Sequence, residues 1–327
     1  MTVEPPSLPI RPPTIYDVAR AAGVAASTVS RAFSRPGRVN AETAERIRTV
    51  ALALGYRTNP LARALPTGRT SMIAVLISDI TNPFYFEIIR GAQAAAAEAG
   101  YTMLLADAQE SDVLEREALD RAIPTVEGIV LASSRMSDSA IRMTAKQRPM
   151  IVLNRAVADV LSLITDNPHG ARRAAEHFAG LGHRTITYVA GPEASWADGV
   201  RWRSLRDAAA DLGLQTRRIG PYRPSVAGGE QAATDFVRKP SSAILAYNDQ
   251  LAIGIIRGLT ATGTVVPDDV SIIGFDNIFA ADLVTPRLTT IAAPLHALGG
   301  TAVHNLLAII NGARSRAAEP MVLPTKL

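Results

Sequence analysis

The chain has no cysteine in its 327 residues, which excludes disulfides, cysteine-ligated zinc, iron–sulfur clusters and thiol catalysis. No apolar run approaches the roughly 18 residues that span a bilayer. Residues 1–13 carry five prolines where a secretory signal would carry an apolar core. These absences predict a cytoplasmic protein that begins with a disordered leader over residues 1–13.

Motifs of the common enzyme classes are also lacking. The sequence contains no Gly-x-Gly-x-x-Gly, P-loop, Gly-x-Ser-x-Gly or His-Glu-x-x-His motif. Its five histidines have no local spacing typical of a metal site. We therefore expect that the protein is not an enzyme and binds no cofactor or metal.

Acidic residues are scarce in residues 1–70, where ten arginines stand against four carboxylates and give a net charge of +6. The remaining residues carry 24 basic and 26 acidic side chains. A basic head on a nearly neutral body predicts phosphate contact by the head alone. A solvated basic surface without a partner is the alternative.

Two short helices joined by a glycine are predicted in the head. Thr14 can cap the first helix, Gly23 ends it, and the second helix runs over 27–33 with Val29 in the angle between the two. A third helix is expected from Asn40 to Gly55, with these residues in the shared core: Ile47, Val50, Leu52 and Leu54. This pattern predicts a helix-turn-helix.

The outer face of the second helix carries the groups that contact DNA. Ala26, Ser27, Ser30 and Arg31 are expected to point outward. Hydroxyls and one arginine reach phosphates and base edges in a major groove. A packed helical hairpin that binds no DNA is the alternative.

A short helix is predicted between Asn59 and Pro66. Such a helix is not stable alone, so a partner must order it. Ala62, Arg63 and Leu65 suit a minor groove, where an apolar wedge unstacks a base step and arginine lies in the negative groove. Docking of Leu65 on the following domain is the alternative.

Apolar strand-like runs alternate with amphipathic helices from residue 71 onward. The runs are 72–77, 101–106, 128–132, 150–153, 185–190, 243–247 and 270–275. This alternation predicts an α/β fold with parallel sheets covered by helices on both faces. Ligands of such sheets bind at the carboxyl ends of the strands.

Polar residues just past these runs are candidates for ligand binding. They are Asp79, Asn154, Arg155, Asn248, Asp249 and Asp276. Their oxygens and amides suit sugar hydroxyls, while Phe84 and Tyr222 suit stacking on a ring face. A helix cap or a loop hydrogen bond is the alternative for each residue, and Trp196 is either cleft wall or exposed loop.

Several segments in register resemble the lactose/galactose repressor (LacI/GalR) family of bacterial regulators. In the head they are TIYDVA (14–19), AGV (22–24), TVSR (28–31), LGY (54–56) and ARAL (62–65). In the body they are 82–84, 127–130, 154–155, 166–167, 181–183, 191–192, 248–249, 274–276 and 288–290. The resemblance covers nearly the whole chain from Thr14.

The resemblance implies a helix-turn-helix domain (14–58), a hinge helix and linker (59–70), and an effector-binding and dimerisation domain (71–327). The last has a periplasmic-binding-protein-like core of two parallel-sheet subdomains, about 71–165 and 166–291, with 292–327 crossing between them. DNA contacts are implied at Thr14, Tyr16, Ala26, Ser27, Thr28, Ser30, Arg31, Asn40, Asn59, Ala62, Arg63 and Leu65. Arg201 and Asp276 match the family's effector-binding arginine and aspartate, and Tyr222 matches its stacking aromatic. We expect Arg201 and Asp276 on facing parts of the cleft.

Three departures from the family pattern stand out. Ala25 replaces a common serine at the start of the recognition helix, so one phosphate contact is in doubt. Pro60 follows Asn59 where relatives place a proline before it, which puts the start of the hinge helix in doubt. The sequence ends at Leu327, before a further strand segment and any tetramerising helix.

We therefore expect a dimeric transcription repressor that binds an inverted-repeat operator and is controlled by a sugar-like effector between the subdomains. A solute-binding protein shares the body but requires a signal peptide and no basic head. A sugar-metabolising enzyme requires a nucleotide or metal motif.

Overall fold

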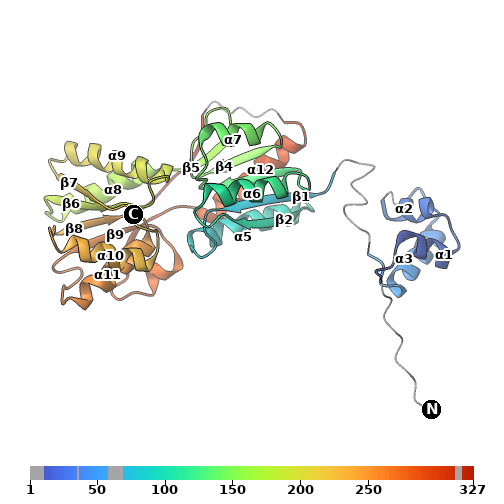
Figure 1. The fold of residues 1–327 in the computed structure, drawn as a ribbon, viewed down its shortest axis with the longest axis horizontal. Coiled ribbons are helices and arrows are strands. Elements are labelled where there is room, and N and C mark those ends of the chain that lie inside the picture. Colours follow the sequence, from blue (N-terminus) through green and yellow to red (C-terminus); the bar gives the residue numbers. More distant parts are fainter. Residues whose placement is uncertain (1–10, 35–36, 58–68, 314–318) are drawn as a thin grey trace, which may run out of the picture. The chain divides into compact units, whose positions relative to one another are not determined.

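The computed structural model describes residues 11–34, 37–57, 69–313 and 319–327 (Figure 1). The chain divides into two compact units, Met1–Ser71 and Met72–Leu327. Most of the expected disordered leader and the expected hinge helix lie outside the described residues, so both stay predictions.

The small unit is built from the helices α1 (Ile15–Ala22), α2 (Ala26–Ser34) and α3 (Ala41–Ala53). Val18, Val29 and Ile47 are fully buried where the three helices meet, which confirms the expected place of Val29. Gly23 ends α1 with a φ of 66°, a left-handed conformation that glycine adopts without a steric cost.

One expectation for this core is wrong. Leu52 is 84% exposed and Leu54 is 40% exposed. Ile47 shares its helix face with residues three or four positions away, and these are Ala44 and Ala51. Leu52 points about 100° away from that face, and Leu54 already lies beyond the end of α3.

The large unit contains two parallel sheets, as the alternation predicts. The first has the order β11-β5-β4-β3-β1-β2 and the second the order β10-β9-β8-β6-β7. The first consists of β1 (Met72–Ile77), β2 (Thr102–Asp107), β3 (Gly128–Ala132), β4 (Met150–Leu153), β5 (Ser162–Thr165) and β11 (Met321–Leu323). The second consists of β6 (Thr185–Val189), β7 (Gln215–Ile219), β8 (Ala243–Ala246), β9 (Ser271–Asp276) and β10 (Thr289–Ala292).

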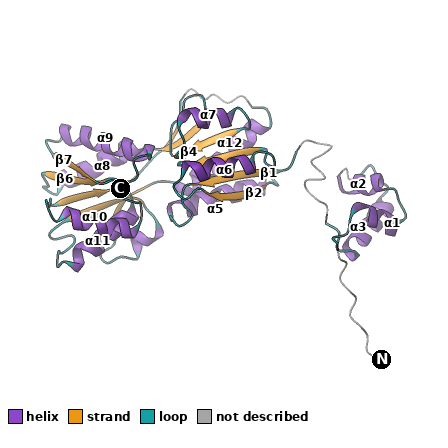
Figure 2. Ribbon diagram, in the orientation of Figure 1, coloured by secondary structure: helices purple, strands orange, loops and turns teal. Residues whose placement is uncertain are grey.

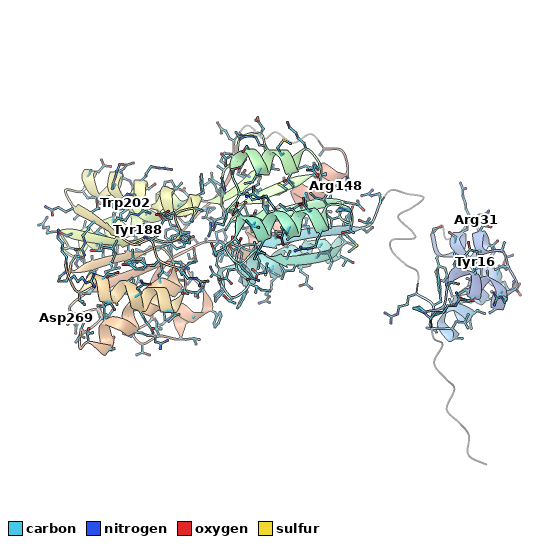
Figure 3. The ribbon with its side chains drawn as sticks, viewed as in Figure 1. Tyr16, Arg31, Arg148, Tyr188, Trp202 and Asp269 are labelled. Carbon is cyan, nitrogen blue, oxygen red and sulfur yellow. The ribbon has the colours of Figure 1, made fainter. Side chains whose placement is uncertain are left out.

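Helices cover both faces of each sheet (Figure 2). We call the first sheet with α5 (Phe84–Glu98), α6 (Asp112–Ala122), α7 (Asp138–Ala145) and α12 (Leu295–Ile310) the first subdomain. The second subdomain is the second sheet with α8 (Asn167–Gly180), α9 (Trp196–Asp211), α10 (Val226–Phe236), α11 (Asp249–Ala261) and the 3-10 helix η1 (Phe279–Asp282). Tyr188 of β6 stacks on Trp202 of α9, with ring centroids 5.7 Å apart (Figure 3).

Two glycines let α5 and α12 cross closely. A Cβ atom at Gly91 would collide with the backbone oxygen of His296, and one at Gly299 with that of Ile88. The late helix α12 is thereby fixed against a helix from the start of the large unit.

The connections between the subdomains lie together. The chain passes from β5 into α8 and from β10 into α12. After β11, Thr325 Oγ1 donates to Asp166 O at 2.9 Å, and Lys326 exchanges two backbone hydrogen bonds with Ala292. Among the described residues, no helix combines the length and the apolar character that crossing a membrane requires.

Candidate functional site

The second helix of the small unit presents a polar outer face. Ser27, Ser30 and Arg31 are exposed, and Tyr16 in α1 is 70% exposed (Figure 3). Thr28 and Ala26 are half-buried. The expectation that Ala26 points outward is wrong, because its methyl group packs against the core of the unit.

Two of the predicted DNA contacts are helix caps. The backbone N and the hydroxyl of Thr14 donate to Asp17 Oδ2 at 2.8 and 2.7 Å, and these bonds lower the pKa of Asp17. Asn40 Oδ1 accepts from Glu42 N at 2.9 Å and caps α3. Helix N-termini are sites where backbone amides bind phosphate. Asn59, Ala62, Arg63 and Leu65 lie outside the described residues.

A cavity lies between the subdomains of the large unit. The first subdomain contributes residues that follow β1 to β4, namely Asn82, Phe84, Tyr85, Glu110, Ser133, Arg135 and Asn154. The second contributes Arg201, Pro224, Tyr247, Asn248 and Asp276. The free volume is about 10 Å³, which is room for about one water molecule. A larger ligand therefore requires the two walls to separate.

Arg201 is the most densely bonded side chain of the cavity. It is 2% exposed, its Nε donates to Asn167 Oδ1 at 2.8 Å, and its Nη1 donates to Tyr247 O. Its Nη2 donates to Asp276 Oδ1 at 3.1 Å, and its Cζ lies 3.6 Å from the centroid of the Phe275 ring. The expectation that Arg201 and Asp276 face each other across the cleft is wrong. Arg201 belongs to the middle of α9, and both residues belong to the second subdomain, where they form a buried ion pair.

Two aspartates of the second subdomain have raised pKa values. Burial raises the pKa of Asp276 to about 6, although the Arg201 charge partly offsets this effect. Burial and the Asp276 charge raise the pKa of Asp249 to about 8. Burial therefore favours the protonated form of both carboxyls, and it does so more strongly for Asp249 than for Asp276.

Five of the predicted effector contacts line the cavity: Phe84, Asn154, Arg201, Asn248 and Asp276. The structure places the other five elsewhere. Asp79 Oδ1 accepts from the backbone N and the hydroxyl of Thr81 and so caps a turn. Trp196 is half-buried in the first turn of α9.

Two of these other residues support loops at strand ends. Asp249 accepts hydrogen bonds from Ile278 N and Thr290 Oγ1 and so holds the loop after β9. Arg155 donates to Ser134 O at 3.0 Å and to Met136 O at 2.6 Å, which holds the loop after β3.

Tyr222 lies on the wall of a neighbouring cavity of about 440 Å³, which Glu110 and Arg135 also line. Its hydroxyl donates to Asp235 Oδ2 at 2.8 Å.

The sequence analysis missed Asn82, Tyr85, Glu110, Ser133, Arg135, Pro224 and Tyr247. Position after a strand was a usable signal for most of them, because Glu110 follows β2 and Ser133 and Arg135 follow β3. Among the described residues, no group of three or more histidine, aspartate and glutamate side chains is placed to hold a metal ion.

This arrangement, a three-helix unit before two parallel-sheet subdomains with a polar cleft, defines a ligand-controlled DNA-binding regulator. Residues 14–59 match the family model of bacterial regulatory proteins, lacI family, and residues 175–327 match that of a periplasmic binding protein-like domain. The HTH-type transcriptional regulator DegA of Bacillus subtilis is 33% identical over 96% of each chain. The chain therefore belongs to the lacI family of transcriptional regulators, and the resemblance inferred from the sequence is confirmed.

Solved structures agree. The Lac repressor dimer bound to operator and the anti-inducer ONPF is 26% identical, with a TM-score of 0.85 over 97% of each chain. A LacI family regulator from Enterococcus faecium with bound ribose is 32% identical. Its TM-score is 0.70, and the match covers 78% of this chain and 96% of that one.

Proposed function

We propose that this regulator is a cytoplasmic repressor without catalytic activity that binds an inverted-repeat operator as a homodimer. The polar face of α2, with Arg31 in the last turn, supports this proposal, because one recognition helix covers only a half-site and a two-fold dimer doubles the contact. Arg31 forms a bidentate contact to guanine in the major groove. The hinge segment 59–70 then completes the contact in the minor groove.

We further propose that a sugar-like effector occupies the cavity between the subdomains and controls operator affinity. The mixture of donors and acceptors at the carboxyl ends of both sheets is the observation that supports this ligand class. Since the cavity has room for about one water molecule, binding is linked to the separation of the walls. Separation and closure are the two states that such coupling requires.

Footprinting on operator fragments tests the DNA part of the proposal. We expect a protected region with two-fold symmetry and a stoichiometry of two chains per site. Arg31→Ala should weaken specific binding by about 1 to 3 kcal/mol and leave binding to random DNA nearly unchanged.

Arg46→Ala is the matched control, because Arg46 is an exposed arginine of α3 and its loss changes the charge equally. An equal loss on specific and random DNA, with a salt slope reduced by about one, would make Arg31 a phosphate contact only. Tight binding by a monomer would contradict the dimer.

A further inference from the structure

Arg135 is a buried arginine with most of its donors unused. Its side chain is 6% exposed, and Nε donates to Glu110 Oε2 at 2.6 Å. That is its only side-chain hydrogen bond within the described part of the chain. A guanidinium carries five N–H donors, so four remain on the two Nη groups. Arg135 lines both the narrow cavity and its larger neighbour, which places these donors at the junction of the two.

The loop that carries Arg135 is held from two sides. Glu115 Oε2 of α6 accepts from the backbone N of Arg135 at 2.9 Å. Arg155 donates hydrogen bonds to the carbonyl oxygens of Ser134 and Met136, which flank Arg135 in the loop. Glu115 is 3% exposed, and burial raises the pKa of its carboxyl. Burying a charged or polar group such as Glu115 costs free energy. Its use to hold this loop indicates that the loop fixes Arg135 in a defined position.

An unused acceptor lies on the same wall. Asn154 Nδ2 donates to Ser133 Oγ at 3.2 Å, whereas Oδ1 is buried and has no partner among the described residues. Buried polar atoms in native structures normally have a partner. A hydroxyl group carries the hydrogen-bond donor that this oxygen lacks.

The balance of charged side chains around the cavity favours a neutral ligand over an anionic one. Glu110 compensates Arg135, and Asp276 compensates Arg201, so these four residues carry no net charge when all are ionised. A carboxylate or phosphate ligand would lie close to two carboxylates, and like charges repel in a poorly solvated site. A hydroxyl both donates and accepts, so a neutral polyhydroxylated ligand satisfies this wall without unbalancing it.

We propose that Arg135 binds two neighbouring hydroxyl oxygens of a neutral sugar effector through its Nη groups, while Asn154 Oδ1 accepts from a third hydroxyl. Glu115 is the positioning residue that fixes the loop. This inference rests on the proposed function and extends it to a specific wall and a specific ligand class.

Binding to a fixed panel tests the inference. The full-length chain is screened by thermal shift against ribose, xylose, galactose, glucose, maltose and cellobiose, with glucuronate and galacturonate as the charged arm. The strongest ligand is then titrated calorimetrically into wild type, Arg135→Leu and Arg135→Lys. We expect a loss of affinity of about tenfold or more for Arg135→Leu. The affinity of Arg135→Lys should lie between those of wild type and Arg135→Leu, because lysine keeps the positive charge but not the planar guanidinium group.

Arg121→Leu is the control, since Arg121 is an exposed arginine of α6 in the same subdomain, with a side chain 71% exposed. It should bind as wild type does. Wild-type affinity in a folded Arg135→Leu variant overturns the inference. If that variant does not fold, unchanged affinity in Arg135→Lys overturns it. Tighter binding of a uronate than of its neutral parent overturns the ligand class. Failure of the wild type to bind any of the eight sugars overturns the sugar-effector part of the proposed function, whereas the operator-binding part stands or falls with the footprinting.

The role of Glu115 is tested separately. Glu115→Gln keeps an acceptor for the backbone N of Arg135 and should bind the ligand within about threefold of wild type, whereas Glu115→Ala should lose affinity. In an Arg135→Lys background, Glu115→Ala should reduce ligand affinity much less, because the guanidinium group that Glu115 positions is absent. An undiminished effect in that background shows a general structural role and overturns the positioning role.

Discussion

Arg135 in the first subdomain and Arg201 in the second are both buried, and both pair with a carboxylate. They differ in how many nitrogens donate inside the protein. Arg201 uses all three, whereas Arg135 uses only Nε within the described residues. Burial and ion pairing therefore do not by themselves tell a structural arginine from a ligand-binding one. The difference in unused donors is the basis of the role proposed for Arg135.

The largest expected effect is on the stability of the second subdomain. Arg201→Met leaves Asp276 buried without its partner, and removing one member of a buried pair typically costs about 3 to 5 kcal/mol. We expect a loss of this size in the free energy of unfolding, measured with urea. Arg135→Met should lose clearly less, because it removes a single side-chain hydrogen bond and because its partner Glu110, with a side chain 19% exposed, keeps access to water. Equal losses in the two variants would break the comparison.

The second effect concerns the carboxylates under the two walls, Asp249 and Glu115, which each hold a loop at a strand end. The pKa of Asp249 is raised to about 8, far above about 3.9 for an unfolded chain. The native state therefore binds more protons between these values, and this group's stabilisation is lost as the pH rises toward 8. The stability difference between wild type and Asp249→Asn should fall by at least about 1 kcal/mol from pH 5 to pH 7.

Urea titrations of both chains at each pH measure this difference. Glu115→Gln should show a dependence of the same sign, because burial also raises the pKa of Glu115. Parallel pH profiles for wild type and Asp249→Asn would show that Asp249 does not titrate in this range.

A smaller effect is expected on effector affinity. The pKa of Asp276 is about 6, so its carboxylate is lost at lower pH, whereas Arg135 stays charged. The affinity for the effector should fall severalfold between pH 7 and pH 5, because Asp276 of the second subdomain becomes protonated. Calorimetry at both pH values should show a flat profile in Asp276→Asn. A fall of the same size in that variant would assign the dependence to another group.

The smallest expected effect concerns a ring contact between the two subdomains. Phe86 of α5 and Phe279 of η1 stack with ring centroids 6.3 Å apart and an interplanar angle of 13°. The two residues are 41% and 61% exposed, so their coupling energy should stay below about 1 kcal/mol. A double-mutant cycle with Phe86→Ala and Phe279→Ala measures it by urea denaturation. A coupling of zero would show that the rings do not hold the walls together.

Strong apolar runs made most of the fold predictable. The runs at 72–77, 128–132 and 150–153 have the observed strand bounds, and four others differ by a residue at one or both ends. Four strands were missed, namely β5, β7, β10 and β11, and each is short or interrupted by charged residues. β7 carries Arg217 and Arg218, and β11 has only three residues. Partner strands, which sequence periodicity does not show, determine both.

The site was harder to predict because its pairings join distant positions. Arg201 and Asp276 are 75 residues apart, so the resemblance named both but the sequence could not show that they bind each other. Arg135 had a usable signal, since it follows a predicted strand. Its unused donors became visible only with the positions of its neighbours.

The order of the strands in the first sheet constrains how the chain folds while it is being synthesised. The second subdomain is contiguous from α8 to β10, so a nascent chain has all of its strands before α12 is made. The first subdomain needs α12 against α5 and β11 beside β5, and both follow the second subdomain in the chain. Domains are usually expected to fold from the N-terminus as they leave the ribosome. Here the part translated earlier keeps the edge of β5 unpaired until Met321–Leu323 emerge, and the part translated later is the first to have its sheet whole.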